Sequence, residues 1–182
     1  MNSIETHRLL LRGWMDDDYL DLHEFISDIR VGQCSGQRIV KDIEESKINI
    51  KTYIMYNQSY AIVLKSENKV IGSIGMDDIA PDKELENLNQ RYIGYTLHPN
   101  YWGNGYASES IRFLIKYLFE ELHLDLIWSS HYDFNIKSKR VIDKSGFKYK
   151  FSRDKTLYAL GNRTVKELFY SSHKNEYSEL YD

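Results

Sequence analysis

A glycine-rich turn, placed between a predicted strand and a predicted helix, is the segment of this sequence best suited to chemistry. Glycines let a backbone approach a ligand closely, and the free N–H groups of a helix's first turn lie at the positive end of its dipole. Together these features predict a site for a diphosphate. On glycine spacing alone, a tight structural turn explains the segment at least as well. The run is Tyr101-Trp102-Gly103-Asn104-Gly105-Tyr106-Ala107-Ser108-Glu109.

Two familiar phosphate-binding motifs do not fit this turn. A Rossmann fingerprint is disfavoured because the turn follows the fourth predicted strand rather than the first. A Walker loop is excluded because the sequence contains no Gly-Lys-Ser or Gly-Lys-Thr. A nucleotide-binding domain of another kind stays open as an alternative on this evidence.

The strands that would position the turn form one sheet. Two pairs of them are expected to be antiparallel hairpins, and the last pair is joined at Gly161-Asn162, which suits a type I′ turn. Residues 77–86 contain Pro81 and are expected to form a loop. The fold class is therefore α/β (α+β), with a single mostly antiparallel mixed sheet flanked by helices. The predicted strands are 4–12, 60–64, 69–76, 90–97, 124–131, 147–160 and 164–171.

Four segments have apolar residues at helical spacing. Asp16-Asp17-Asp18 is expected to cap the first helix, and the second is expected to line an acceptor cleft. Asn135 is expected to cap the last helix by accepting from the N–H near Ser138, and Gly146 to end it. The predicted helices are 17–27, 40–56, 105–122 and 135–145.

Composition narrows the class of protein. The length and the 42% hydrophobic content suit one domain spanning residues 1–182. A net charge of −3 argues against nucleic acid as a partner and suits a cationic one better. The single cysteine, Cys34, and the absence of zinc-ligand spacing predict no metal and a cytoplasmic location. The sequence has no signal-like segment and no apolar run of the roughly 20 residues that a membrane span needs, so no membrane contact is expected. For the oligomeric state, a monomer and a homodimer both fit the sequence.

The glycine-rich turn and its surroundings resemble the GNAT superfamily of N-acetyltransferases. Its motif A pattern, Gln/Arg-x-x-Gly-x-Gly/Ala, is met at Gly105 and Ala107, with Trp102 in the Gln/Arg position. The preceding Ile-Gly-Tyr-Thr-Leu-His-Pro, residues 93–99, is similar to the branch that acetylates ribosomal-protein N-termini, the Rim type. Three more segments resemble that branch in the expected order: residues 6–12, residues 70–75 and the motif B segment 135–147.

The resemblance implies that the fourth and fifth strands splay apart and that coenzyme A lies in the gap. Unpaired backbone groups of Thr96 and Leu97 would hold the pantetheine arm. The glycine-rich turn would hold the diphosphate. Cations of the last helix would contact the adenosine phosphates, although a solvated helix face explains them equally well. The implied cofactor-binding residues are Thr96, Leu97, Trp102, Gly103, Asn104, Gly105, Tyr106, Ala107, Asn135, Lys137, Ser138 and Arg140, with Lys139 a further candidate.

The implied reaction is transfer of an acetyl group from acetyl-CoA to a primary amine, by direct attack in a ternary complex. A backbone N–H near Leu97 would polarise the thioester carbonyl. Relatives often carry a glutamate base on the fourth strand, but Tyr92 stands there and would orient a relaying water. His131, Asp77 and Asp78 are the alternative bases.

Two further questions stay open at this stage. Ile142 replaces the motif B tyrosine that serves as general acid elsewhere, so Ser138 is the candidate acid, unless it is only a first-turn helix residue. Without the usual Glu and Tyr, a catalytically weak or silent CoA-binding module is the alternative function. Acceptors could be a protein N-terminus, a polyamine or an aminoglycoside. Acidic residues in 77–86 favour a cationic acceptor, although a solvated loop explains them too.

Overall fold

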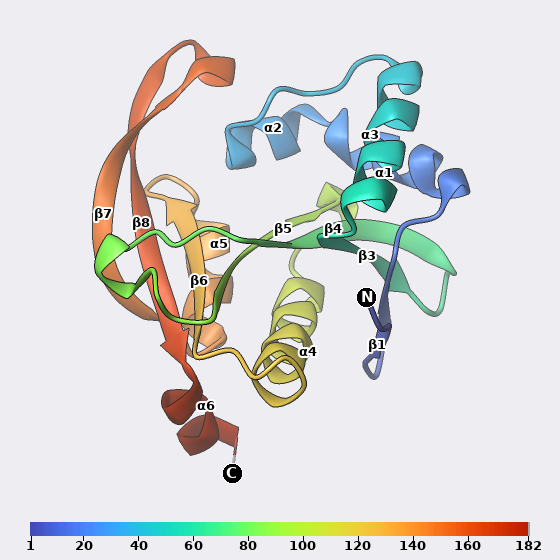
Figure 1. Ribbon diagram of the computed structural model, residues 1–182. Helices are drawn as coiled ribbons and strands as arrows, with labels where there is room; N and C mark the ends of the chain where they lie inside the picture. The colour runs from blue at the N-terminus through green and yellow to red at the C-terminus, as the bar shows by residue number, and fades with distance from the viewer. Residues whose placement is uncertain (182) are drawn as a thin grey trace.

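One eight-stranded sheet organises the protein in the computed structural model, which describes residues 1–181. All neighbouring strands are antiparallel except β5 and β6, which are parallel. The mixed, mostly antiparallel sheet predicted from the sequence is confirmed (Figure 1). In sheet order the strands are β1 (Ile4–Glu5), β2 (Leu9–Arg12), β3 (Ser59–Leu64), β4 (Lys69–Asp77), β5 (Gln90–Leu97), β6 (Leu126–Tyr132), β8 (Arg163–His173) and β7 (Lys148–Leu157).

Helices cover both faces of this sheet. Three lie on one face, α4 and α5 lie on the other, and α6 follows the last strand (Figure 1). None of the helices in the described part of the chain is long and apolar enough to cross a membrane. The helices are α1 (Tyr19–Ile26), α2 (Ile29–Ser35) and α3 (Ile43–Tyr56) on the first face, α4 (Tyr106–Glu120) and α5 (Ile136–Lys144) on the second, and α6 (Lys174–Tyr181).

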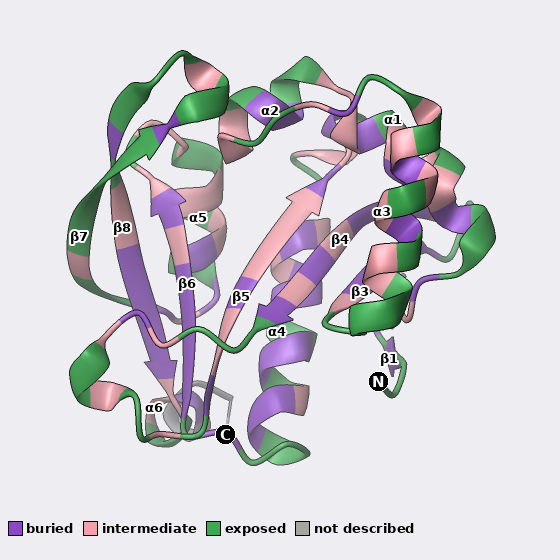
Figure 2. Cartoon of the chain, turned by 45° about the horizontal axis from the view of Figure 1, so that its top comes forward, coloured by how far each residue is buried: buried purple, intermediate pink, exposed green. Residues whose placement is uncertain are grey.

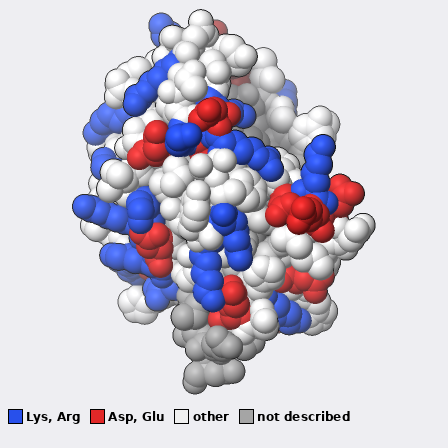
Figure 3. All heavy atoms as spheres, turned by 90° about the vertical axis from the view of Figure 1, so that its left-hand side faces the viewer, with Lys and Arg blue, Asp and Glu red and all other residues white. Residues whose placement is uncertain are grey.

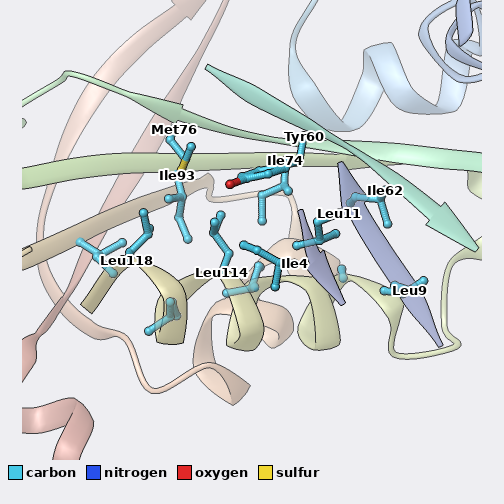
Figure 4. Close-up of a cluster of buried hydrophobic side chains, with 14 of the residues drawn as sticks. Ile4, Leu9, Leu11, Tyr60, Ile62, Ile74, Met76, Ile93, Leu114 and Leu118 are labelled. Carbon is cyan, nitrogen blue, oxygen red and sulfur yellow. The ribbon is translucent and has the colours of Figure 1, made fainter. Parts of the chain in front are cut away.

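Apolar cores form on both faces of the sheet because successive strand residues point to opposite faces. On β3, Ile62 faces α4, where it joins Leu11, Leu114 and Leu118 in the larger core (Figure 4). Its neighbours Ala61 and Val63 face the other way and pack with α1 and α3. Figure 2 shows the same division on α4, whose inner side is buried and outer side exposed. The sheet is therefore packed against helices on both faces at β3.

The outer edge of the sheet is charged. β7 is the edge strand, and its residues are exposed along most of their length. Basic side chains on this face discourage pairing with a strand of another molecule (Figure 3). On β7 they are Lys148, Lys150, Arg153 and Lys155.

The chain departs from the predicted elements near its N-terminus. The strand predicted over 4–12 is interrupted, because Thr6 turns the chain by bonding the backbone N–H of Leu9 at 2.8 Å. Asp18 lies at the N-cap position of α1, as expected, but its side chain makes no capping bond to the helix, and Asp16–Asp18 form a 3-10 turn before it. The carboxylate of Asp18 instead pairs with both guanidinium NH groups of Arg12, at 2.7 and 2.8 Å.

The remaining elements match the predictions more closely, with two additions. α4 and β5 lie where they are predicted, and Asn135 caps α5 through Ser138 N at 3.1 Å. The final hairpin has the expected positive φ at Gly161 and Asn162, but a 3-10 turn precedes them. Two helices, α2 and α6, are absent from the predictions. The first lies beside the functional cleft.

Candidate active site

The cleft begins where β5 and β6 separate. Only Gln90, Arg91 and Tyr92 of β5 pair with β6, opposite Leu126 to Trp128. Beyond them the strands diverge, so the last five residues of β5 have no strand partner on that side, although the Ser129 hydroxyl of β6 still donates to the carbonyl of Ile93 at 3.1 Å. This divergence is the splay expected between the fourth and fifth main strands. It opens onto a cleft of about 1060 Å³, bounded by the turn before α4, by α5 and, on the other face, by α2 and α3.

Most of the residues predicted for the site line this cleft. Asn104 does not, because its side-chain amide donates back to the carbonyl of Tyr101 at 3.2 Å. Asp78 is also outside, paired with Arg91 at 2.7 Å. The predicted residues that line the cleft are Asp77, Tyr92, Thr96, Leu97, Trp102, Gly103, Gly105, Tyr106, Ala107, His131, Asn135, Lys137, Ser138 and Arg140.

Two glycines shape the turn at the start of α4. Gly103 and Gly105 have φ of 83° and 81°, in the left-handed region that side chains disfavour. A Cβ on Gly103 would meet no atom within 4 Å, so backbone conformation rather than space selects glycine there. Gly105 is the residue from which α4 begins. The free N–H groups of the helix's first turn therefore face the cleft, as an anion site requires.

The N-terminal segment holds this turn in place. Arg8 donates to the carbonyl of Asn104 at 3.0 Å, and its guanidinium lies 2.7 Å from the carboxylate of Glu109 on α4. The same guanidinium stacks on Tyr106, 4.5 Å from the ring centroid. Thr6 also donates to Glu109. Residues 6–8 were identified by resemblance, but their contact with a turn about a hundred residues away could not be derived from sequence.

Trp102, in the position where Gln or Arg is usual, is part of a stacked pair. Lys137 of α5 lies over its ring, with Nζ 3.9 Å from the centroid. The indole N–H donates to the carbonyl of Leu97 at 2.9 Å. The stacking partner of Trp102 is therefore a residue of the protein itself. Lys139 is excluded from this wall, because it pairs with Asp143 at 2.6 Å and does not line the cleft.

The exposed edge of β5 is contributed by alternate residues. Successive residues of an antiparallel ladder turn their backbone groups to opposite sides. His98 N donates to Ile71 O across β4 at 2.8 Å, so Thr96 also turns its backbone groups toward β4. Leu97 turns its groups toward the gap. Of the two residues expected to offer unpaired backbone groups, only Leu97 does so, and it offers its N–H, since its carbonyl accepts from Trp102. Thr96 contributes its side chain to the wall.

A tyrosine–serine pair lies on the α4–α5 face of the splay. Tyr95 and Ser138 are joined by a hydrogen bond of 2.8 Å between their hydroxyls. Burial raises the pKa of Tyr95 to about 12, although the bond to Ser138 acts in the opposite direction. Tyr95 is therefore a neutral hydrogen-bonding group at physiological pH. The sequence pointed to Ser138 but gave no sign of its partner.

A second hydroxyl chain lies on the opposite face. Tyr92 is hydrogen-bonded to Ser130 of β6, and Ser130 donates to the carboxylate of Glu167 on β8 at 2.7 Å. Both Ser130 and Glu167 line the cleft. Burial raises the pKa of Tyr92 to about 12. Glu167 and Ser130 were not predicted, because their proximity depends on the register of strands far apart in the chain.

His131 is a poor candidate for a free base in this structure. Its side chain is buried, and Nδ1 donates to the carbonyl of Tyr132 at 2.8 Å. Nε2 is then the acceptor, and it lies 3.1 Å from the hydroxyl of Tyr170. Both ring nitrogens are occupied within the protein, so the imidazole has no free position toward a ligand.

The remaining half of the cleft has an open floor of small residues. Gly75 of β4 lies opposite Gly94 of β5, and a Cβ on Gly94 would meet nothing within 4 Å. Above this floor Tyr53 and Tyr56 of α3 and Cys34 of α2 close the cleft. The titratable carboxylates in this half are Asp77 and Glu167. Burial and the charge of Asp78 raise the pKa of Asp77.

This arrangement, a mixed sheet split at its parallel pair beside an anion-suited helix start, defines the class of acyl-CoA N-acyltransferases. The comparisons agree. The family model described as Acetyltransferase (GNAT) domain matches residues 8–148. The chain belongs to this GNAT acetyltransferase family, and it is an N-acetyltransferase that uses acetyl-CoA as its acetyl donor.

Similar proteins span almost the same length. The uncharacterized N-acetyltransferase YoaA of Bacillus subtilis is 30% identical over 79% of this chain and 81% of its own. A GNAT-family acetyltransferase structure from Bacillus anthracis is 26% identical, with a TM-score of 0.82 over 96% of this chain and 99% of its own. The ribosomal-protein-S5-alanine acetyltransferase of Vibrio fischeri is 19% identical over 97% and 99%, with a TM-score of 0.77, which shows a shared fold.

Proposed function

We propose that this enzyme transfers the acetyl group of acetyl-CoA to a primary amine by direct attack in a ternary complex. One observation carries the proposal: a single gap between β5 and β6 joins two chemically different halves of one cleft. The half beside α4 and α5 has free helix N–H groups and the cations Lys137 and Arg140. The half beside α2 and α3 has the carboxylates Asp77 and Glu167. An anionic donor and a cationic amine suit these halves.

The donor would lie along the open edge of β5. Helix N–H groups after Gly105 would bind the diphosphate, and Lys137 and Arg140 would neutralise adenosine phosphates. The backbone of β5 that faces the gap would continue the ladder with the pantetheine arm, and the N–H of Leu97 would stabilise the oxyanion. The fit rests on the missing β6 partner beyond Tyr92, which leaves this edge available.

The pair formed by Tyr95 and Ser138 would supply a proton donor for the departing thiolate. Tyr95 and Ser138 lie on the donor half, on the same side of β5 as Leu97. The phenol stays protonated at neutral pH because burial raises its pKa to about 12. We place Ser138 as the donor, oriented by Tyr95. A thiol pKa of roughly 8.5 makes this demand modest.

The acceptor would be a cationic primary amine, either a protein N-terminus or a small amine. The Rim-like segments at residues 6–12 and 93–99 favour the N-terminal branch. The acidic half of the cleft supports a cationic acceptor of either kind. A cytoplasmic location and the oligomeric state stay predictions.

Calorimetric titration with coenzyme A, ATP and NAD tests the proposal. Gly105→Glu places a carboxylate at the helix start, so we expect it to abolish CoA binding. Gly105→Ala is the matched control, because it carries the same strain at positive φ without the charge. Equal loss in both variants, or preference for ATP or NAD, contradicts the site. Thiol release with a panel of amines then separates an enzyme from a silent module, which would bind CoA and release none.

A further inference from the structure

The hydroxyl chain on the acceptor half of the cleft has a direction. Ser130 has one hydroxyl proton, and it is donated to Oε1 of Glu167 at 2.7 Å. The bond between Ser130 and Tyr92 must therefore use the proton of the phenol. Both hydroxyl donors of this hydrogen-bonded series, Tyr92 and Ser130, therefore point toward Glu167. The phenolic oxygen of Tyr92 keeps its lone pairs free to accept a hydrogen bond from a group in the cleft.

Glu167 has no cationic partner in the described part of the chain. Arg153 lies opposite it on β7, but its guanidinium stacks on Phe151, 4.7 Å from the centroid, and donates to Pro81. The adjacent Lys166 pairs with Asp154 at 3.1 Å. Oε2 of Glu167 accepts no hydrogen bond from any described residue. The carboxylate is thus free to receive a proton.

The other titratable groups around Glu167 are acidic or phenolic. Asp77 lies at the end of β4, opposite Tyr92 in the ladder, and Tyr132 lies opposite Glu167 on β6. Burial raises the pKa of both Tyr92 and Tyr132. Neither phenol can serve as the final proton acceptor at neutral pH, since each would have to give up its own proton. Among these groups, the carboxylates alone can hold a proton taken from an amine.

We infer that Tyr92, Ser130 and Glu167 form a proton relay that deprotonates the acceptor ammonium, with Glu167 as the terminal base. This inference rests on the proposed function. An N–H of the ammonium donates to the phenolic oxygen of Tyr92. The N–H bond breaks as Tyr92 gains that proton and passes its own to Ser130, which passes its proton to Glu167. One O–H bond forms on the carboxylate, and the neutral amine keeps the electron pair that attacks the thioester.

The relay also answers a question that the sequence left open. Tyr92 stands where relatives often carry a glutamate. Burial raises the pKa of its phenol to about 12, so the phenol stays protonated at neutral pH and cannot act as the base itself. Glu167 supplies the missing carboxylate from β8, two hydroxyls away. The water that the sequence suggested beside Tyr92 is replaced in this role by the side chain of Ser130.

The test is the pH dependence of kcat/KM for Glu167→Gln, with acetyl-CoA and the best amine of the panel. Glutamine still accepts from Ser130 but cannot take a proton, so we expect a loss of about 100-fold at pH 7. The loss should shrink by about tenfold per pH unit as the amine deprotonates in solution toward its own pKa, which is about 8 for a protein N-terminus and about 10 for a small alkylamine. The CoA Kd should be unchanged. Asp154→Asn, on the adjacent edge strand, is the matched control and should behave as wild type.

A second comparison tests the path rather than its end. Tyr92→Phe should slow the reaction by at least about tenfold, and adding it to Glu167→Gln should cost little more, because both act in one path. Multiplicative effects overturn the relay. It is also overturned if Glu167→Gln is harmless, if its loss is the same at every pH, or if Asp77→Asn carries the pH-dependent loss instead. A wild-type protein that binds no CoA refutes the proposed function itself.

Discussion

Removing the carboxylate of Glu109 tests whether the N-terminal segment holds the turn at the start of α4. Glu109 is buried, with 8% of its side chain exposed, and it accepts from Thr6, from Arg8 N at 3.0 Å and from Arg8 Nε at 2.7 Å. Glu109→Ala deletes all of these bonds. Thr6 keeps a second acceptor in the carbonyl of Leu9 at 3.2 Å, whereas the backbone N–H of Arg8 loses its only side-chain partner.

The expected loss in the free energy of unfolding follows from these hydrogen-bond and ion-pair partners. Breaking a fully buried ion pair costs about 3–5 kcal/mol. Arg8 is 40% exposed and can turn to water, so we expect a smaller loss, about 2–3 kcal/mol in the free energy of unfolding. For a chain of this length that lowers Tm by about 4–12 °C. Arg8 would also hold the carbonyl of Asn104 less firmly, and we expect the CoA Kd to rise about fivefold.

The assay is thermal unfolding followed by circular dichroism, with Glu84→Ala in the exposed 77–86 loop as the control. Glu109→Gln adds a test of pH. Burial alone would raise the pKa of Glu109, but the hydrogen bonds from Thr6 and Arg8 outweigh it and lower the pKa. A lowered pKa stabilises the fold above the unfolded-state pKa of about 4.3, and this contribution is lost as pH falls through the folded-state value. The Tm gap between wild type and Glu109→Gln should therefore narrow below about pH 4.

Two outcomes would refute this reasoning. A Tm for Glu109→Ala within 1 °C or so of wild type would mean that the carboxylate contributes nothing net. A Tm gap for Glu109→Gln that widens toward acid pH would mean that the pKa is raised, and that the hydrogen bonds from Thr6 and Arg8 do not dominate its environment.

Two further predictions concern the halves of the cleft. Gly94→Val fills open space on the acceptor floor without backbone strain, so KM for the amine should rise at least about tenfold while the CoA Kd stays constant; steady-state kinetics with an unchanged KM would place the acceptor elsewhere. Lys137→Ala removes a cation that lines the cleft, so calorimetry should show CoA binding weakened a few-fold. The CoA Kd of this variant should also depend less on salt than that of the wild type. Lys139→Ala, paired with Asp143 outside the cleft, should bind CoA normally, and equal effects would contradict the assignment.

Features set by local sequence could be predicted. α4 has an unbroken apolar period, β5 is bounded by a proline, and Asn135 caps α5 within three residues of itself, so each lies close to its predicted place. α2 was missed because it is short and contains Gly32, which lowers helix propensity. The interruption between β1 and β2 was missed because one hydroxyl, that of Thr6, turns a segment that is otherwise typical of a strand.

Features set by strand register could not be predicted. Glu167 reaches Ser130 because β8 returns antiparallel beside β6. Ser130 reaches Tyr92 because Tyr92 lies opposite Trp128, and Ser130 follows Trp128 by two residues on the same face. A shift of one residue in either pairing would turn these side chains to the opposite face. The bond from Arg8 to Asn104 likewise joins distant segments. The sequence therefore predicts Tyr92 on β5, His131 on β6 and Asp77 or Asp78 at the end of β4 as candidates for the base, and not Glu167 on β8.

The alternation of β5 explains how one strand can serve both proton transfers without mixing them. Tyr92 and Gly94 face the acceptor half, while Tyr95 and Leu97 face the donor half. Each tyrosine is bonded to a serine from the element on its own side, Ser130 of β6 or Ser138 of α5. In the proposed mechanism, the backbone between them separates the group that would take a proton from the amine from the group that would give one to the thiolate. The thioester carbon must then lie in the gap itself, because only there do both halves meet.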